Sequence, residues 1–385
     1  MQSFLFHSPM QVFFGKREIA RIPEILLREQ GNHGRVLLLT DTGVAASGIP
    51  QRIVEQIKAC GFSTELIDTV PREPYSTDVD ELVDSVKNKK FDFIIGVGGG
   101  SVLDTAKLLS VLLVLKTATV ESLLEKGVSE KGIPSIMVPT TAGTGSEATP
   151  NAIIVLKDKQ LKVGIVSPFL VPPYVVLDPE TTLGLPSSLT AATGLDALCH
   201  LLECYISKRA NPHSDLLALE GTRLIFTSLH KAFIDGSDVE ARSNMLLASF
   251  YGGLCIASSS TTAVHALSYP LGGAYRIPHG VANAILLAPI MEFNRDAVVE
   301  RLIQAAIRIG ISPKLGDSDL SIAFVRTVKE LVQSLKIPSR LSEFGIKKEN
   351  IPELTEQALK VSRLLSNNPK PMSYEDIKSI YERIL

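Results

Sequence analysis

Four side chains of types that bind metal ions stand in two short stretches of this 385-residue sequence. Asp196 and His200 are four positions apart in TGLDALCH, and His265 and His279 are fourteen apart in VHALSYPLGGAYRIPHG. Mixed imidazole and carboxylate ligation suits Fe(II), Zn(II), Co(II) or Mn(II). Four such ligands leave a position at a divalent ion for an oxygen atom of another molecule. The pattern therefore favours a site of chemistry over a structural site.

The spacing also indicates how the chain presents these side chains. Asp196 and His200 lie in the helical pattern AATGLDALCHLLECYIS, where residues four apart project from one face. His265 is expected to open a second helical stretch, and His279 follows the turn-rich segment GGAYRIP. A lone histidine is more often a core or surface residue than a ligand, but the joint pattern predicts one divalent ion.

A second candidate site is the glycine-rich segment IIGVGGGSVLDTAK. Gly98, Gly99, Gly100 and Ser101 stand between a predicted strand and a predicted helix, where backbone N–H groups can approach a phosphate at the positive end of the helix. The spacing is not the usual dinucleotide fingerprint. A tight strand-to-helix turn is the alternative, but one glycine would serve for that, so we favour a phosphate site.

Two further polar segments follow predicted strands. Asp41 in VLLLTDTG has the chemistry to accept hydrogen bonds from a ribose diol and repel a 2′-phosphate, or to cap a turn or helix. PTTAGTGSEAT supplies hydroxyls at Thr140, Thr141 and Thr144. Such turns are often simple caps, but at the carboxyl end of a parallel strand this one would face the crevice of the glycine loop.

The elements that must position these residues change character near residue 184. Up to that point, strand-like runs alternate with amphipathic helical stretches, which predicts an α/β domain with a largely parallel sheet at 1–184. Beyond it helical patterns dominate, which predicts an all-α domain at 185–385. The predicted strands are RVLLLTD, STELIDTV, FDFIIGV, IPSIMVP and YVVLDP.

The composition indicates which classes of binding partner the protein can have. The formal charge of −2 and the lack of a lysine or arginine run argue against nucleic acid and favour a small-molecule partner. The most apolar run, LLSVLLVL, falls short of the roughly 18 residues that span a bilayer, so we expect a buried helix and no membrane insertion. Four cysteines without C-x-x-C spacing, and no evident signal peptide, favour a reduced cytoplasm.

Several of these segments together resemble the iron-containing (group III, metal-dependent) alcohol dehydrogenases, nearly from end to end. The resemblance is carried by FHSPMQVFFGK, GGGSVLDTAK, PTTAGTGSEAT, TGLDALCH, the His265 to His279 stretch and NNPKPMSYEDIKSIY. It implies a dehydroquinate synthase-like, Rossmann-related domain that binds NAD(P), followed by an all-helical metal-binding domain. The implied reaction is reversible hydride transfer between nicotinamide and a short-chain primary alcohol or aldehyde, with Fe(II) as the ion and Zn(II) as the alternative. We also expect a homodimer or a higher homo-oligomer.

The resemblance assigns roles by position in this sequence. Asp196, His200, His265 and His279 match the metal ligands of the family. Lys162 in LKVGIVSP matches a lysine that contacts the cofactor, and Asp41 stands where NAD-preferring members carry aspartate, which implies NAD(H). The residues that match pyrophosphate and nicotinamide contacts are Gly98, Gly99, Gly100, Ser101, Thr140, Thr141 and Thr144.

The chain departs from the family pattern around the predicted ion. Tyr269 stands where many members have a second histidine, and a phenol with a pKa near 10 is a poorer proton acceptor than imidazole. Tyr269 therefore either takes part in proton transfer or walls the pocket. Arg276 replaces a neutral polar residue or histidine, and either pairs with an anionic group of the substrate or forms a surface ion pair. The segment PREPYST departs from a P-N-P-T pattern near the adenosine site.

Two other functions fit part of this pattern. A lyase of the dehydroquinate synthase type shares the two-domain plan, NAD and a divalent metal, but the Asp/His/His/His set argues against it because that type has a glutamate ligand. A non-catalytic sensor of NAD and metal is disfavoured, since nothing obvious in the sequence blocks the open coordination position. Net NADH production with a simple alcohol distinguishes the dehydrogenase from both.

Overall fold

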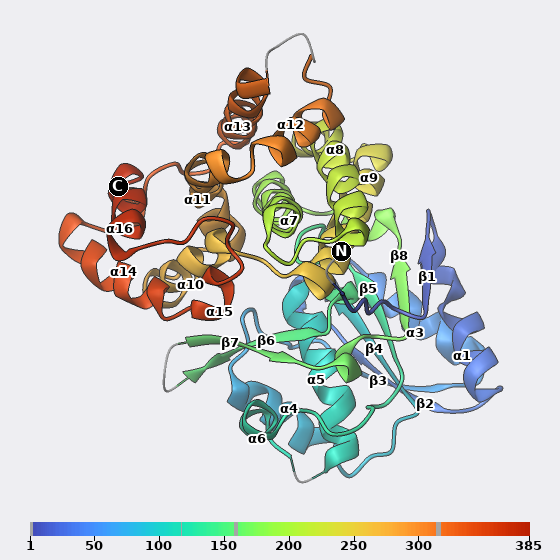
Figure 1. Cartoon of the computed structure of the whole chain (residues 1–385). Helices are drawn as coiled ribbons and strands as arrows, with labels where there is room; N and C mark the ends of the chain where they lie inside the picture. The colour runs from blue at the N-terminus through green and yellow to red at the C-terminus, as the bar shows by residue number, and fades with distance from the viewer. Residues whose placement is uncertain (1–2, 117, 158–160, 313–316) are drawn as a thin grey trace. The chain divides into compact units, whose positions relative to one another are not determined.

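The computed structural model of the chain describes residues 3–116, 118–157, 161–312 and 317–385. They form two compact units, coloured from blue to red along the chain in Figure 1. The α/β unit comprises His7–Thr141 and Gly145–Gly184. The helical unit comprises Leu185–Leu385 together with residues 3–6 and the short segment Ala142–Thr144.

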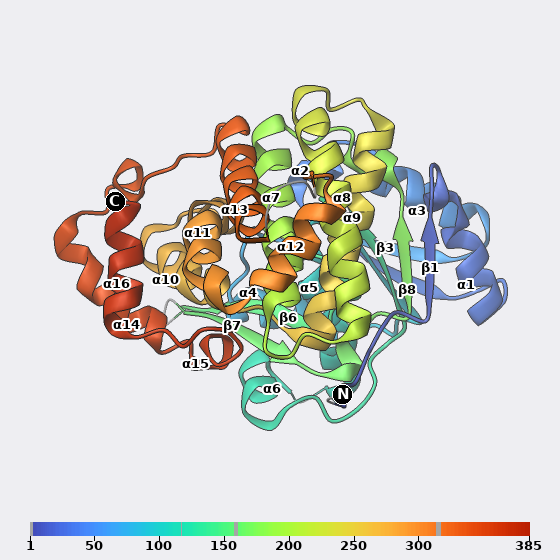
Figure 2. The ribbon, with the colours of Figure 1, turned by 45° about the horizontal axis from the view of Figure 1, so that its top comes forward.

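A parallel sheet organises the α/β unit, as the alternating pattern predicts. The strand order is β1-β8-β5-β4-β2-β3, and β1 lies beside β8 at one edge (Figure 2). The five predicted strands are confirmed, whereas the edge strand β1 and the antiparallel hairpin β6–β7 were not predicted. The strands are β1 (Gln11–Phe14), β2 (Arg35–Leu39), β3 (Ser63–Ile67), β4 (Phe93–Gly98), β5 (Ser135–Pro139), β6 (Asn151–Leu156), β7 (Leu161–Val166) and β8 (Tyr174–Leu177).

Alternating side chains of the buried strands face the two sides of this sheet. On one side Val36 and Leu38 of β2 pack with helices α1 and α3. On the other side Leu37 and Leu39 pack with α4, α5, α6 and the β6–β7 hairpin. The run LLSVLLVL is buried within α5, as expected. The helices of this unit are α1 (Ile22–Gln30), α2 (Thr42–Ala45), α3 (Ile49–Ala59), α4 (Ser76–Val86), α5 (Gly100–Leu115) and α6 (Val120–Lys126).

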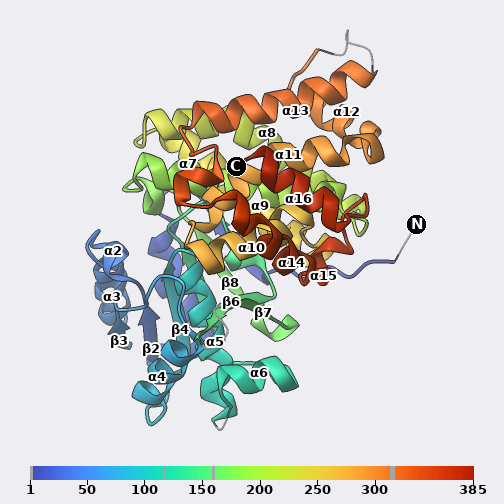
Figure 3. The same ribbon diagram turned by 90° about the vertical axis from the view of Figure 1, so that its left-hand side faces the viewer.

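The helical unit is all-α in the residues described, which confirms the fold class expected for this part of the chain. Helices α10, α14, α15 and α16 gather along one side of it (Figure 3). The helices are α7 (Ser187–Ile206), α8 (Pro212–Ile234), α9 (Val239–Ser259), α10 (Ala263–Tyr275), α11 (His279–Asn294), α12 (Val299–Arg308), α13 (Asp317–Ser334), α14 (Ile351–Leu359), α15 (Ser362–Leu365) and α16 (Tyr374–Arg383).

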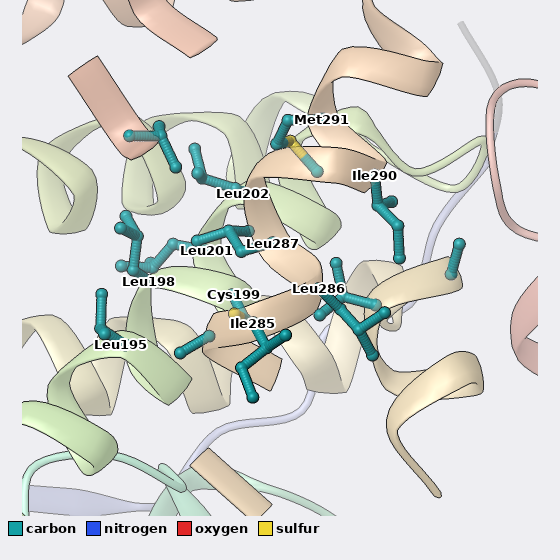
Figure 4. Close-up of a cluster of buried hydrophobic side chains, with 14 of the residues drawn as sticks. Leu195, Leu198, Cys199, Leu201, Leu202, Ile285, Leu286, Leu287, Ile290 and Met291 are labelled. Carbon is teal, nitrogen blue, oxygen red and sulfur yellow. The ribbon is translucent and has the colours of Figure 1, made fainter. Parts of the chain in front are cut away.

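Helix α7 lies at the centre of the core of the helical unit and contacts α8, α9 and α11. Figure 4 shows its side chains, among them Leu198 and Leu202, with those of α11, among them Leu286 and Ile290. Cys199 is fully buried in this cluster, so it is a packing residue. Because α7 and α11 are buried on several sides, the polar side chains that they carry are held in a rigid, poorly hydrated setting.

Two segments of the helical unit differ from expectation. The segment GGAYRIP is not a turn throughout, because α10 continues to Tyr275 and only residues 276–278 separate it from α11. The pattern PELTEQALKVSRLLS forms two helices rather than one, with a break at Lys360 and Val361. None of the helices that the structure describes has the length and apolar content needed to cross a membrane.

Candidate functional site

The four predicted ion ligands converge in the helical unit. Oδ1 of Asp196 lies 3.8 Å from Nε2 of His200, 3.8 Å from Nε2 of His265 and 3.6 Å from Nε2 of His279. The Asp196 and His200 side chains come from successive turns of α7, as the four-residue spacing predicts. His265 lies in the first turn of α10, and His279 is the first residue of α11.

A close contact between α7 and α11 brings His279 to this group. Gly280 is the next residue of α11, and a Cβ atom there would lie 2.2 Å from the carbonyl oxygen of Ala192 in α7. Any other residue would clash with this carbonyl, so glycine allows the start of α11 to approach α7. The approach sets the position of His279 against Asp196.

These side chains fit a divalent ion. The ligand atoms of Asp196, His265 and His279 lie within 4.8 Å of one another, and Nε2 of His200 lies at a similar distance from Asp196. Three nitrogen donors and one carboxylate oxygen suit Fe(II) and Zn(II). Asp196, His200 and His265 are buried, whereas the His279 side chain remains 30% exposed. His279 is therefore the most exposed of the four side chains.

Glu203 contacts the His265 ring at Nδ1, on the side away from Asp196. The sequence analysis did not predict a role for this residue. This fully buried carboxylate accepts a hydrogen bond from Nδ1 of His265 through Oε2. Its Oε1 accepts from Thr262 N and Oγ1, both at 2.9 Å, and from Val264 N at 2.7 Å. Glu203 thus joins α7 to the start of α10. A proton held on Nδ1 leaves the lone pair of Nε2 facing Asp196, which is the form that binds a metal.

His200 is oriented in the same manner by the backbone. Its Nδ1 donates to the carbonyl oxygen of Gly143 at 3.2 Å, so its Nε2 also presents a lone pair toward Asp196. Gly143 belongs to the short segment that packs with the helical unit, and a Cβ at this position would meet Thr193 of α7 at 2.7 Å. Both buried histidines are therefore held in one tautomer by a partner on the far side of the ring.

Burial and charge set the ionisation of the group. Burial disfavours the Asp196 carboxylate, yet the three histidines and the Asn283 amide hold the pKa of Asp196 below its ordinary value. Burial lowers the pKa of His200. Burial also acts to lower the pKa of His265, but the Glu203 carboxylate outweighs it and raises that pKa. Near neutral pH the site thus holds an ionised carboxylate and a neutral His200.

Tyr269 and Arg276 lie on α10 or at its end. The Tyr269 ring centroid is 6.4 Å from that of His265 and 6.1 Å from that of His279, and burial raises the pKa of Tyr269 to about 12. Arg276 is exposed and caps the C-terminus of α10 in the left-handed region, with φ 55°. Its backbone N–H donates to the carbonyl of Gly272 at 3.1 Å.

The glycine loop of the α/β unit lies at the carboxyl edge of the sheet. Strand β4 ends at Gly98, and Gly100 begins α5. A Cβ at Gly98 would lie 2.6 Å from the Val102 side chain, so glycine allows the chain to turn directly into the helix. Thr140 donates its N–H to Gly98 O at 3.0 Å, and Thr141 lies beside Gly99. The structure brings the first two threonines to the glycine loop, whereas Thr144 packs with the helical unit.

Lys162 and Asp41 both have protein partners. Lys162 Nζ lies 2.5 Å from a carboxylate oxygen of Glu73, and the Glu73 N–H donates to Ser101 Oγ at 3.1 Å. Glu73 therefore links Lys162 to the glycine loop and belongs to PREPYST, the segment that departs from the family pattern. Asp41 Oδ1 accepts from the N–H groups of Gly43 and Val44, so the structure shows its role as the N-cap of α2.

Comparison with known proteins identifies the family to which this chain belongs. The family described as iron-containing alcohol dehydrogenase matches residues 9–179, and its C-terminal part matches residues 190–385. A long-chain-alcohol dehydrogenase of Geobacillus thermodenitrificans is 38% identical over 352 residues, covering 90% of this chain and 88% of the relative. A solved 1,3-propanediol oxidoreductase superposes with a TM-score of 0.94 at 30% identity, with both chains fully covered.

A third relative has a solved complex. Sulfoacetaldehyde reductase from Bifidobacterium kashiwanohense, solved with NAD+, has a TM-score of 0.90 at 27% identity, covering 100% of this chain and 99% of that one. The family matches, the relatives and the fold agree from the first strand to the last helix. The chain belongs to the iron-containing alcohol dehydrogenase family and is an oxidoreductase of that class.

Proposed function

We propose that this protein is an NAD(H)-linked, metal-dependent alcohol dehydrogenase that interconverts a short-chain primary alcohol and its aldehyde. The observation that carries the proposal is the convergence of Asp196, His200, His265 and His279 on one point of the helical unit. Such a group with one partly exposed member matches a chemical ion site better than a structural one. In this proposal the α/β unit supplies the cofactor contacts other than Thr144, which belongs to the helical unit.

The chain's own residues prepare the ion site. Glu203 holds the proton of His265 on Nδ1, and the carbonyl of Gly143 does the same for His200. The lone pair of each Nε2 is therefore free to bind an ion. The ionised Asp196 offsets part of the positive charge. These residues would hold a divalent ion, which would supply Lewis-acid polarisation of the substrate oxygen, and the glycine loop would hold a nicotinamide nucleotide, which would supply hydride chemistry. We propose Fe(II) as the ion, with Zn(II) as the alternative.

The glycine loop is the proposed site of the cofactor pyrophosphate. Gly99, Gly100 and Ser101 place backbone N–H groups at the start of the 16-residue helix α5, whose N-terminus attracts anions. Thr140, Thr141 and Thr144 are the proposed neighbours of the pyrophosphate and the nicotinamide, and Lys162 a further contact. The complex of a solved relative with NAD+ supports this choice of cofactor.

Asp41 is the proposed determinant of NAD(H) over NADP(H). Asp41 stands two positions after the end of β2, and its carboxylate repels a 2′-phosphate in this proposal, in addition to capping α2. The kinetic comparison of NADH with NADPH tests the assignment, and we expect NADH to be preferred. A clear preference of the wild-type enzyme for NADPH would contradict it.

Arg276 bears on the substrate class. It stands three residues before His279 and is exposed, so its guanidinium is available to a carboxylate or sulfonate on the substrate. One solved relative is a sulfoacetaldehyde reductase, which supports an aldehyde with an anionic group as the variant substrate of this proposal. Tyr269 is proposed to wall the pocket, since its surroundings favour the neutral phenol.

The assay that tests the function is NADH-dependent reduction of neutral and anionic short aldehydes by protein loaded with Fe(II) or Zn(II). We expect turnover with short aldehydes and net NADH formation with the corresponding alcohols. Lack of turnover on the whole panel would overturn the proposal. If Arg276→Ala left the ratio of neutral to anionic substrate turnover unchanged, the role of Arg276 would be refuted.

We further propose a cytoplasmic homodimer or larger homo-oligomer. All four cysteines are unpaired, which suits a reducing compartment. Strand β1 at the edge of the sheet exposes Val12 and Phe14, and apolar side chains on an edge strand are commonly covered by another chain. Light scattering after size exclusion checks the assembly, and a monomer at micromolar concentration would contradict it.

A further inference from the structure

Asn283 lies inside the group of proposed ion ligands. It stands one turn after His279 on α11 and is fully buried. Its Nδ2 is 2.7 Å from Oδ1 of Asp196 and 3.2 Å from Nε2 of both His265 and His279. The amide thus faces the same three atoms that we propose as ligands.

The other end of this amide is left without a partner. Oδ1 of Asn283 is buried and accepts no hydrogen bond from the residues that the structure describes. A buried unsatisfied polar atom costs about 1–3 kcal/mol and calls for an explanation. The hydrogen bond to Asp196 accounts for the nitrogen of this amide, so the unpartnered oxygen is the atom that points to a ligand.

The orientation of the amide depends on what the three atoms bind. In the arrangement described, Nδ2 donates one hydrogen to the Asp196 oxygen, and its second hydrogen lies on the side of the two imidazole nitrogens. A cation bound by these atoms would meet the positive end of the N–H dipole at close range, which is unfavourable. Rotation of the amide by half a turn exchanges oxygen for nitrogen without a change of shape, whereas a swing of the whole side chain has no exposed space to enter.

We propose that Asn283 is a further member of the ion centre, and that its side-chain oxygen faces the ion as an additional ligand. The inference rests on the ion site of the proposed function. Asparagine carbonyl oxygens are established ligands of Ca(II), and the amide oxygen is the one donor atom that this side chain can offer to a divalent ion. On this account the amide turns as the ion binds, and the same residue serves as hydrogen-bond donor to Asp196 before binding.

The experiment compares the dissociation constant of Zn(II) or Co(II) across variants of the full chain, measured by competition with a chromophoric chelator. Asn283→Leu removes both polar atoms and is expected to weaken binding by about tenfold or more. Asn283→Asp keeps the shape and offers oxygen in either orientation, so it is expected to bind at least as tightly as wild type. Co(II) absorption should differ between wild type and Asn283→Leu, because the ligand number differs.

A matched control lies further along the same helix. Asn294 is also fully buried in α11 but bonds to Asn368 rather than to the ion group, so Asn294→Leu should leave the Zn(II) constant unchanged. Binding by Asn283→Leu within twofold of wild type, or binding by Asn283→Asp tenfold weaker than wild type, would overturn the inference. The second result would mean that Asn283 acts only as a donor to Asp196.

One further variant separates this inference from the function on which it rests. His200→Ala removes a proposed ligand without touching Asn283 and should abolish tight binding. If wild type and His200→Ala bind Zn(II) equally, the proposed ion site itself fails. If His200→Ala loses the ion while Asn283→Leu keeps it, the site stands and only the role of Asn283 is refuted.

Discussion

Replacement of Glu203 by glutamine should weaken the ion site without changing any proposed ligand. Oε2 of Glu203 accepts from Nδ1–H of His265, and Oε1 accepts from Thr262 and Val264. If the glutamine NH2 faces His265, two donors meet, and relief requires the imidazole proton to move to Nε2. That proton occupies the lone pair needed by the ion. If the NH2 faces Thr262 and Val264 instead, their N–H groups lose their acceptor.

Either arrangement forfeits at least one hydrogen bond to a charged group, worth about 1.5–3 kcal/mol. At 1.36 kcal/mol per factor of ten, the ion constant should weaken by roughly 10- to 100-fold, which agrees with the usual effect of such outer partners. Chelator competition with Zn(II) measures this loss. Glu203→Gln should also lower the pKa of His265 and so shift the acid limb of ion binding to lower pH.

The control is the cofactor affinity of the same variant. NADH binding, followed by its fluorescence, should remain at the wild-type value because Glu203 lies in the helical unit and the glycine loop in the other. An ion constant within twofold of wild type in a folded Glu203→Gln protein would refute the role that we give to this carboxylate.

Three further predictions concern single residues outside the proposed ligands. Burial raises the pKa of Glu147 to about 7 from 4.5, so the stability that it contributes is present below pH 4.5 and lost as the pH rises through 7. That change amounts to about 3 kcal/mol, and urea unfolding at several pH values should show it in wild type but not in Glu147→Gln. Tyr269→Phe should leave the pH profile of kcat between pH 6 and 9 unchanged, because burial raises the pKa of Tyr269 to about 12. If the variant lost one limb of this profile, the phenol would be shown to titrate in that range. Glu73→Gln should tighten NADH binding by about fivefold, since it removes a negative charge beside Lys162 and the glycine loop; equal or weaker binding in a fluorescence titration would count against the phosphate site.

The elements that the sequence predicted well are those with a local signal. Five buried strands showed short apolar runs between helical stretches, and all five lie in the parallel sheet. Asp196 and His200 project from one face of α7 because a four-residue spacing on a helix determines this without knowledge of the rest of the fold.

The features that the sequence did not reveal depend on contacts between distant segments. Glu203 follows His200 by three positions on the same face of α7, so the helix pattern could have indicated it as a neighbour. Its role depends on α10, which begins at this carboxylate some sixty positions later in the chain. The sequence does not show that contact. The carbonyl of Gly143 reaches His200 across 57 positions, and a backbone atom carries no signal in residue type.

The structure also differs from the sequence prediction at the edge strand β1, at the β6–β7 hairpin and at the end of α10. Strand β1 has a mixed burial pattern and only four residues, so its apolar content did not separate it from a loop. The hairpin β6–β7 forms a separate antiparallel pair that packs on helices α4, α5 and α6, so the alternation of strands and helices that predicts a parallel sheet did not indicate it. Arg276 occupies a left-handed position that glycine usually takes, which no spacing rule indicates.

The most direct test of the central claim is the dependence of turnover on the ion held by Asp196, His200, His265 and His279. Protein stripped by a chelator is loaded with increasing Fe(II) or Zn(II), and bound metal and NADH-linked turnover are measured in the same samples. We predict that turnover rises in proportion to the ion and saturates at one ion per chain. His265→Ala should bind NADH with the wild-type constant yet show neither ion nor turnover. Undiminished turnover in stripped protein, or in His265→Ala, would contradict the account.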